Sequence, residues 1–103
     1  MNTEELIEEI ENITTHMFAT EQNVYHKIKV ILSYINNICQ MLLQILPDLK
    51  SMGVDLDSEY ILQQLHSVVE AVEKNDEVLL FDVLTYEIKE TLKLWIEIEK
   101  MVE

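Results

Sequence analysis

The sequence contains no arginine, and its seven lysines face 20 acidic residues, which leaves a net charge of −13. Arginine is the side chain that binds phosphate groups in a planar, bidentate geometry. Binding to nucleic acid needs clustered cationic side chains, and an anionic membrane surface repels an acidic protein. We therefore expect neither a nucleic acid nor a membrane as a partner of this chain.

Glycine and proline occur once each among the 103 residues, as Gly53 and Pro47. A β-sheet fold needs many turns, and turns need these two residue types, so the composition favours long helices. A chain of about 100 residues forms one domain with one modest core. We expect a single helical-bundle domain over residues 1–103.

The only cysteine, Cys39, cannot form an intrachain disulfide, and it lies among apolar residues. We interpret it as a small buried thiol. The N-terminal stretch MNTEELIEEI is acidic and amphipathic, and it lacks the basic start and apolar run of a signal peptide. These features favour a soluble protein of a reducing cytoplasm.

One stretch, Asn23–Leu46, has the strongest pattern and predicts a long central helix. No acidic residue occurs between Gln22 and Pro47. Apolar residues that follow each other at steps of four and three form a stripe along one side of an α-helix. The stripe consists of Val24, Ile28, Ile31, Ile35, Ile38, Leu42 and Ile45. Amides and a serine interrupt the uncharged run that ends at Pro47, so we interpret it as a bundle helix rather than a membrane span.

Three further helices are predicted from caps and periodicity. The first starts near Thr3, where Asn2 can cap it and Glu5 completes a capping-box-like pair. The third runs from an N-cap at Asp57 to about Lys74, and the fourth spans Glu77–Val102. The expected buried residues are Leu6, Ile10, Ile13 and Met17 with Ile7 and Phe18, then Ile61, Leu65, Val68 and Val72 with Leu62 and Val69 beside them, and finally Phe81, Leu84, Ile88, Leu92, Trp95, Ile98 and Val102. A break is expected at Thr20–Asn23.

The lengths of these helices and their short connections predict an all-α fold, an antiparallel four-helix bundle. Pro47 follows the central helix while the apolar rhythm continues beyond it. We therefore expect either a kink at Pro47 or a short extra turn that starts there and ends at Gly53. Asn75 and Asp76 are expected to form the tight connection between the third and fourth helices.

The predicted core contains no ionisable catalytic or metal-binding group. Helical bundles that hold metals use Glu-x-x-His pairs on inward positions, and none occurs here. The sequence also lacks a glycine-rich phosphate loop and a serine in a nucleophile elbow. We predict a non-catalytic protein without a cofactor or metal. Its histidines, His16, His26 and His66, keep open the alternative of a small-ligand or metal-binding bundle.

The outer side of the central helix is the most informative surface. Besides its wide apolar stripe it carries uncharged polar residues, namely Ser33, Asn36, Asn37, Gln40 and Gln44. Depletion of charge is typical of interface centres. Either the helix is enclosed within one subunit, or this side contacts another subunit. Leu79 and Leu80 lie in the first turn of the fourth helix, which is apolar all round, and they are either buried or part of a subunit contact. We favour a homodimer.

The segment from Asn75 to Trp95 resembles a pattern in small, uncharacterised bacterial proteins of Firmicutes type. The matching residues are Leu80, Asp82, Leu84, Tyr86, Glu87, Ile88 and Trp95. That resemblance implies no activity. In size and helix content the chain is also similar to bundle chaperones of flagellar export. The resulting hypothesis is a protein-protein interaction module, adaptor-like or chaperone-like, that acts as a homodimer and binds a protein partner.

Overall fold

The computed structural model describes residues 1–17 and 24–101. Helix α1 spans Thr3–His16, α2 spans Val24–Ser51 and α3 spans Ser58–Lys74. A last helix follows in three parts, α4 (Glu77–Asp82), a π-helical segment η1 (Val83–Ile88) and α5 (Lys89–Met101). The described residues contain no strand, and the predicted all-α class is confirmed. The predictions for Phe18, Thr20–Asn23 and Val102 lie outside the described residues.

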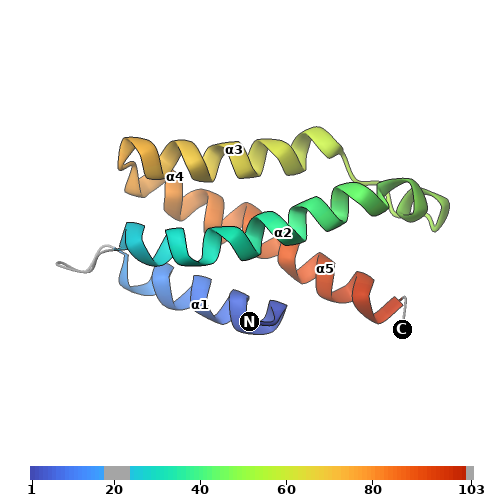
Figure 1. Ribbon diagram of the computed structural model, residues 1–103, viewed down its shortest axis with the longest axis horizontal. Coiled ribbons are helices and arrows are strands. Elements are labelled where there is room, and N and C mark those ends of the chain that lie inside the picture. The colour runs from blue at the N-terminus through green and yellow to red at the C-terminus, as the bar shows by residue number, and fades with distance from the viewer. Residues whose placement is uncertain (18–23, 102–103) are drawn as a thin grey trace.

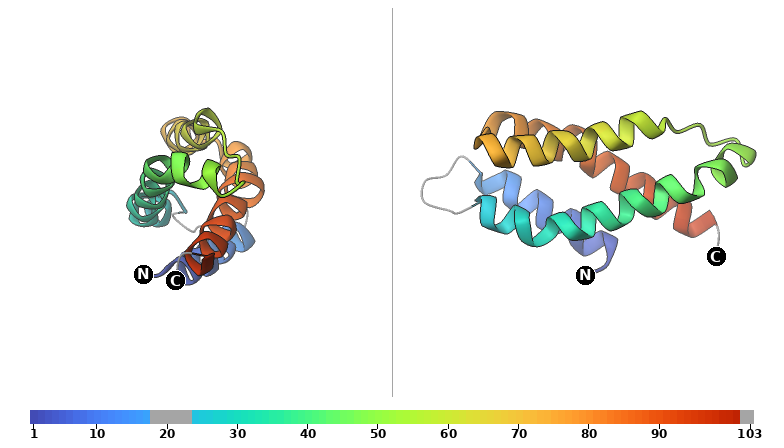
Figure 2. Two further views of the ribbon diagram at one scale, coloured as in Figure 1. Left: turned by 90° about the vertical axis from the view of Figure 1, so that its right-hand side faces the viewer. Right: turned by 45° about the horizontal axis from the view of Figure 1, so that its top comes forward.

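The helices lie along one long axis, with extents of 47 × 24 × 19 Å. Figure 1 shows α2 between α3 on one side and α1 on the other, while the last helix crosses behind α2. The last helix contacts α3 through α4 and η1, and it contacts α1 through η1 and α5. Figure 2 shows that the start of α1 and the end of α5 lie on the same side of the molecule. Because α1 is much shorter than α2, it covers only part of α2 and α5.

The start of α1 is set by local hydrogen bonds that the sequence predicts. The side-chain oxygen of Asn2 accepts from the backbone N–H of Glu5 at 2.8 Å, and the backbone N–H of Asn2 donates to Glu5 Oε1 at 3.4 Å. This is the predicted capping box, which satisfies N–H groups that lack a partner within the helix. The predicted buried residues Leu6, Ile10 and Ile13 are indeed buried.

The connections on either side of α3 also follow the sequence. Gly53 has φ 86° and Asn75 has φ 52°, the left-handed conformation that commonly ends a helix. The N–H of Val54 donates to the carbonyl of Leu49 at 2.9 Å, and the N–H of Asp76 donates to that of Ala71 at 2.9 Å. These bonds satisfy carbonyls at the ends of α2 and α3.

The side chains of two aspartates cap the next helices. Asp57 accepts from the N–H of Glu59 at 2.9 Å at the start of α3, and Asp76 accepts from the N–H of Leu79 at 3.0 Å at the start of α4. Both caps were predicted. The connections around α3 are therefore determined by residues within a few positions of each turn.

Pro47 lies inside α2, and the helix continues to Ser51 without a break. The alternative of a separate helical turn that starts at Pro47 is therefore wrong. Proline removes one backbone donor and crowds the preceding turn, but it does not prevent a helix when the surrounding residues are held by packing. Leu49 lies beyond Pro47 and is 1% exposed, so the last turn of α2 is anchored in the core.

The π-helical segment of the last helix was not predicted. Leu80, Leu84, Ile88 and Leu92 follow at steps of four, which drift around an α-helix by about 40° per step, since it has 3.6 residues per turn. All four are nevertheless buried in the core. The N–H of Lys89 donates to the carbonyl of Leu84, the i→i−5 bond of a π-turn. The wider turns of η1 offset part of the drift where the helix passes from α3 to α1.

The inward face of α3 differs from the prediction. Its buried residues are Ile61, Gln64, Val68 and Ala71. Leu65 and Val72 are only half-buried, and the expected flanking residues Leu62 and Val69 are exposed. The two sets share the same helical spacing and differ by a small rotation about the helix axis. Contacts with the last helix select this rotation, and a hydropathy pattern does not resolve it.

Candidate partner-binding surface

All five polar residues that we singled out on α2 are exposed. They are Ser33, Asn36, Asn37, Gln40 and Gln44. Val30, Tyr34 and Met41 are exposed beside them. No charged residue occurs between Lys29 and Asp48, so this outer side of α2, which we call the amide face, is uncharged over its whole length. It is open to solvent in the single chain.

Leu79 and Leu80 at the start of the last helix do not belong to this surface. Leu80 is 0% exposed and lies in the core. Leu79 is half-buried and packs against the core. Of the two alternatives for this turn, burial or a subunit contact, burial holds for Leu80, because its side chain is used by the fold of the single chain.

A groove opens along one edge of the amide face. It lies between the N-terminal end of α1, the middle of α2 and the C-terminal part of α5, and it has a volume of about 620 Å³. The groove exists because α1 is short. Beyond the N-terminal end of α1, both α2 and α5 continue without a helix that covers them (Figures 1 and 2). Asn37 is the residue of our predicted surface that lines it.

The groove is lined by apolar and polar groups in similar measure, and its rim is charged. The apolar lining is Met1, Leu6, Tyr34, Ile38, Met41, Trp95 and Ile96. Leu6 and Ile38 are buried, while Tyr34 and Met41 are 39% and 41% exposed. The charged lining is Glu4, Glu99 and Lys100. The Thr3 hydroxyl donates to Glu99 Oε1 at 3.5 Å, which joins α1 to α5 at this rim.

Sequence reasoning missed this groove because its parts are far apart in the chain. Trp95 was expected to be a core anchor, yet it is only partly buried and lines the groove. Tyr34 and Met41 were visible as a widening of the apolar stripe of α2, and this widening was the available signal. Whether this wider stripe is covered or lines a groove depends on where α1 starts relative to α2 and α5.

The titratable groups behave as structural or surface residues. Burial raises the pKa of the Cys39 thiol to about 11, so this thiol stays protonated and unreactive at neutral pH. His66 Nε2 lies 3.7 Å from Glu70 Oε2, one helical turn away on α3. His16 Nδ1 lies 2.8 Å from the carbonyl oxygen of Asn12. Within residues 1–17 and 24–101, no three His, Cys, Asp or Glu side chains gather closely enough to hold a metal ion.

The core contains a polar pair that the sequence did not reveal. Gln64 on α3 is 0% exposed and Thr91 on α5 is 8% exposed, and the Thr91 hydroxyl donates to Gln64 Oε1 at 2.9 Å. Gln64 Nε2 and the Thr85 hydroxyl of η1 are buried and have no hydrogen-bond partner among the described residues. The polar pair and Thr85 lie where the last helix crosses α3.

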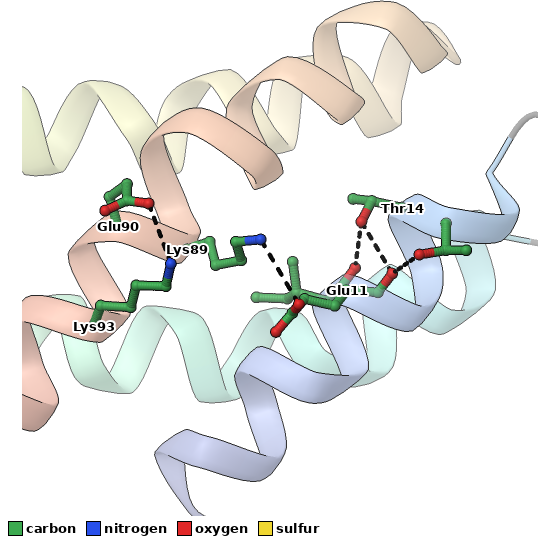
Figure 3. Close-up of polar contacts among 7 residues, drawn as sticks. Glu11, Thr14, Lys89, Glu90 and Lys93 are labelled. Atoms are coloured by element: carbon green, nitrogen blue, oxygen red, sulfur yellow. Dashed lines mark hydrogen bonds and ion pairs between the residues drawn. The ribbon is translucent and has the colours of Figure 1, made fainter.

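The outer face of the last helix carries ordinary surface pairs. Lys89 Nζ reaches Glu11 Oε2 of α1 at 3.9 Å, and Lys93 Nζ lies 3.4 Å from Glu90 Oε1 (Figure 3). Tyr86 is 66% exposed. Exposed pairs of this kind contribute little to stability. This face is a solvated surface that holds α5 to α1.

The segment Tyr25–Ser51 is long and apolar enough to cross a membrane by length and composition alone, with a mean hydropathy of 1.3. The central helix of a water-soluble bundle meets the same two criteria. Within the 18-residue window that defines this segment, 28% is buried in the molecule. The low buried share reflects the amide face and the groove.

The chain matches one protein family over nearly its whole length. A family described as Domain of unknown function (DUF8042) matches residues 2–98. The likeness is therefore not limited to the last helix, as the pattern from Leu80 to Trp95 had suggested. Comparisons with curated proteins and with solved structures give no match. Since the match extends from the capping box of α1 through most of α5, the chain belongs to the DUF8042 family of domains of unknown function.

Proposed function

We propose that this chain is a non-catalytic protein-interaction module of the bacterial cytoplasm, adaptor-like or chaperone-like. In this proposal it is an antiparallel four-helix bundle, with α2 bent at Pro47, the usual cause of sharp helix kinks. It acts as a homodimer and binds a protein partner rather than nucleic acid or a membrane. The net charge of −13 supports that choice of partner.

The uncharged amide face of α2 is the observation that carries this proposal. Exposed surfaces of acidic proteins normally carry charge, and charge depletion is the compositional mark of an interface centre. Asn37, Gln40 and Gln44 are exposed, and amides donate and accept hydrogen bonds across a helix pair. The exposed side chain of Val30 lies beside these amides and adds apolar contact area outside the groove.

Electrostatics favour the same face for self-association. Two copies of a chain with a net charge of −13 repel each other. The repulsion is smallest where the facing surfaces have no charge, and Val30 to Pro47 form such a surface on α2. A two-fold dimer needs one self-complementary patch. Two α2 helices packed through their amide faces satisfy this requirement.

The test is a pair of matched double variants. Asn37→Arg with Gln44→Arg places two cations on the amide face, seven residues apart. Both residues are exposed, so the stability of a single subunit should change by less than ~0.5 kcal/mol. We expect the wild-type chain to be dimeric by light scattering and this variant to be monomeric, because like charges across an interface oppose association.

The control is Leu62→Arg with Val69→Arg on α3, which has the same spacing on another exposed face. This control should remain dimeric. A monomeric wild-type chain, or a dimer that survives the α2 variant, contradicts the proposed homodimer. Dissociation of both variants would show sensitivity to added charge in general rather than a role for the amide face.

A small-ligand-binding bundle is the second candidate function, and the groove favours it. Its volume of about 620 Å³ lies within the usual range of ligand sites. Native mass spectrometry of freshly purified protein would detect a retained small molecule. A metal-binding version has less support, since His16, His26 and His66 lie on α1, α2 and α3 respectively, and the described residues contain no metal-binding cluster.

A further inference from the structure

The groove has the length of a helix-binding site. Tyr34, Ile38 and Met41 follow at steps of four and three along α2 and line one wall. Seven residues of helix span about 10 Å, or two turns. Helices that bind in grooves insert apolar side chains at positions i, i+3 or i+4, and i+7, which cover the same length. The wall of α2 therefore matches two turns of an amphipathic helix.

The opposite wall adds an aromatic anchor and adaptable side chains. Trp95 and Ile96 of α5 are partly buried there, so each keeps some apolar surface open. Met1 and Met41 also line the groove. Methionine is flexible and polarisable, and it adapts to apolar side chains of different shapes. The groove can therefore bind leucine and other apolar side chains of similar size.

The charge of the rim selects the type of helix. Glu4 and Glu99 are exposed and have no cationic partner among the described residues. Lys100, the lysine at this rim, lies 3.7 Å from Glu97 Oε1. The rim therefore has two uncompensated carboxylates, one on α1 and one on α5. A second copy of this acidic chain would add negative charge here, whereas a cationic helix would neutralise these carboxylates.

We propose that the groove binds a basic amphipathic helix of a partner protein. The inference rests on the proposed function as an interaction module, and it names the chemistry of the partner. Leucine-like side chains of that helix pack on Tyr34, Met41 and Trp95. Lysines or arginines beside them lie near Glu4 and Glu99. The amide face remains available for the second subunit, apart from Asn37, which lies at the edge of the groove.

The only tryptophan of the chain, Trp95, gives a direct readout. The probe is a synthetic peptide of roughly 15 residues made of leucine and lysine, with leucine at i, i+3, i+4 and i+7. We expect a saturable blue shift of the Trp95 emission, because the peptide removes the indole from water. Two control peptides should cause no shift: one with the same composition but without helical periodicity, and one with glutamate in place of lysine.

Matched protein variants test the walls and the rim separately. Met41→Lys removes an apolar contact and adds a repulsive charge, so binding should weaken by about tenfold or more, while Val69→Lys on α3 should bind as the wild type does. Glu4→Gln with Glu99→Gln should weaken binding by about fivefold. Its control is Glu59→Gln with Glu73→Gln, which changes the net charge equally at the two ends of α3. Circular dichroism checks that each variant is folded.

The outcomes separate this inference from the proposed homodimer. A monomeric chain that binds the peptide overturns the homodimer and leaves the groove proposal standing. If the chain is a dimer and the peptide does not shift its Trp95 emission, the groove proposal is overturned and the homodimer stands. Equal binding of the scrambled or glutamate peptide contradicts the stated chemistry. If Met41→Lys dissociates the dimer, the groove holds a second copy. A shift with phosphatidylcholine vesicles instead of peptide identifies a lipid surface as the occupant.

Discussion

The outer faces of α2 and α3 both expose apolar side chains, but the two faces differ in charge. On α3, Leu62 and Val69 are 50% and 40% exposed, and they lie among charged residues. Lys74 Nζ donates to Glu70 Oε1 at 2.7 Å on the same helix. On α2, Tyr34 and Met41 lie among amides. Single exposed apolar residues are normal on protein surfaces, so the absence of charge on α2 is what distinguishes its face as an interface.

The inner faces of the two helices also differ in polarity, and here α3 is the helix with an uncharged amide. Among the described residues, α2 buries only apolar side chains and the Cys39 thiol, while α3 buries Gln64. Thus between Val30 and Pro47 the polar groups on the outside of α2 are uncharged, whereas α3 has charged groups outside and one amide inside. The inner pattern affects stability, and the outer pattern affects association.

Leu42→Ala in the inner face of α2 should cost about 2–5 kcal/mol of unfolding free energy, because Leu42 is 0% exposed and its loss leaves a cavity. The matched change on the outer face of α3, Leu62→Ala, should cost less than ~0.5 kcal/mol. Urea unfolding followed by circular dichroism measures both values. A large cost for Leu62→Ala would mean that the outer face of α3 is covered, and the comparison of the two helices would fail.

Thr91→Val tests the polar residue inside α3. It should cost about 1–3 kcal/mol, because Gln64 Oε1 then loses its donor within the core. Gln64→Leu combined with Thr91→Val replaces both partners by apolar groups of similar size, and we expect the double variant to be more stable than Thr91→Val alone. The four proteins of this double-mutant cycle are compared by urea unfolding. Additive costs would show that the pair has no coupling energy.

The charged outer face of α3 should give the smallest effect. The hydrogen bond and charge of Lys74 lower the pKa of Glu70 below its ordinary value of 4.5, and Glu70 in turn raises the pKa of Lys74 above 10.5. A lowered carboxyl pKa stabilises the fold above pH 4.5, and this contribution is lost as the pH falls through the folded pKa. The raised lysine pKa stabilises the fold below pH 10.5, and this contribution is lost at higher pH.

Glu70→Gln should therefore reduce the difference in urea midpoint between about pH 7 and about pH 3 by a small amount. The control is Gln40→Glu on α2, which adds a carboxylate without a partner and should not increase this difference through pairing. A pH dependence that is unchanged in Glu70→Gln would mean that the pair is fully screened by solvent. In that case the outer faces of α2 and α3 would differ in composition but not in energetics.

Much of the fold is predictable because its determinants are local. The capping box of Asn2 and Glu5, the cap at Asp57 and the left-handed Asn75 each depend on residues within a few positions, and the structure has all three. The inward stripe of α2 was also predicted, since its apolar residues repeat over many turns. By contrast, Leu62 and Val69 were expected beside the core and are exposed, because neighbouring helices select the rotation of α3.

The candidate surface divides in the same way. The five amide-face residues from Ser33 to Gln44 are exposed, as their polarity indicates. For Leu80 the sequence left burial and a subunit contact open, because an apolar turn gives no sign of which of its sides faces the core, and the structure shows burial. Trp95 and Glu99 were not recognised as groove residues. They meet Tyr34 only after the chain has folded, and no spacing in the sequence relates them.

The sequence by itself determined that four helices form, where most of them end, and that one helix has an uncharged outer side. These properties depend on backbone hydrogen bonds and side chains that are neighbours along the chain. Only the tertiary structure decided the π-segment, the burial of Gln64 and the groove. Each depends on contacts between helices: the last helix must keep Leu80 and Leu92 buried while it passes from α3 to α1, and α1 leaves part of α2 and α5 uncovered.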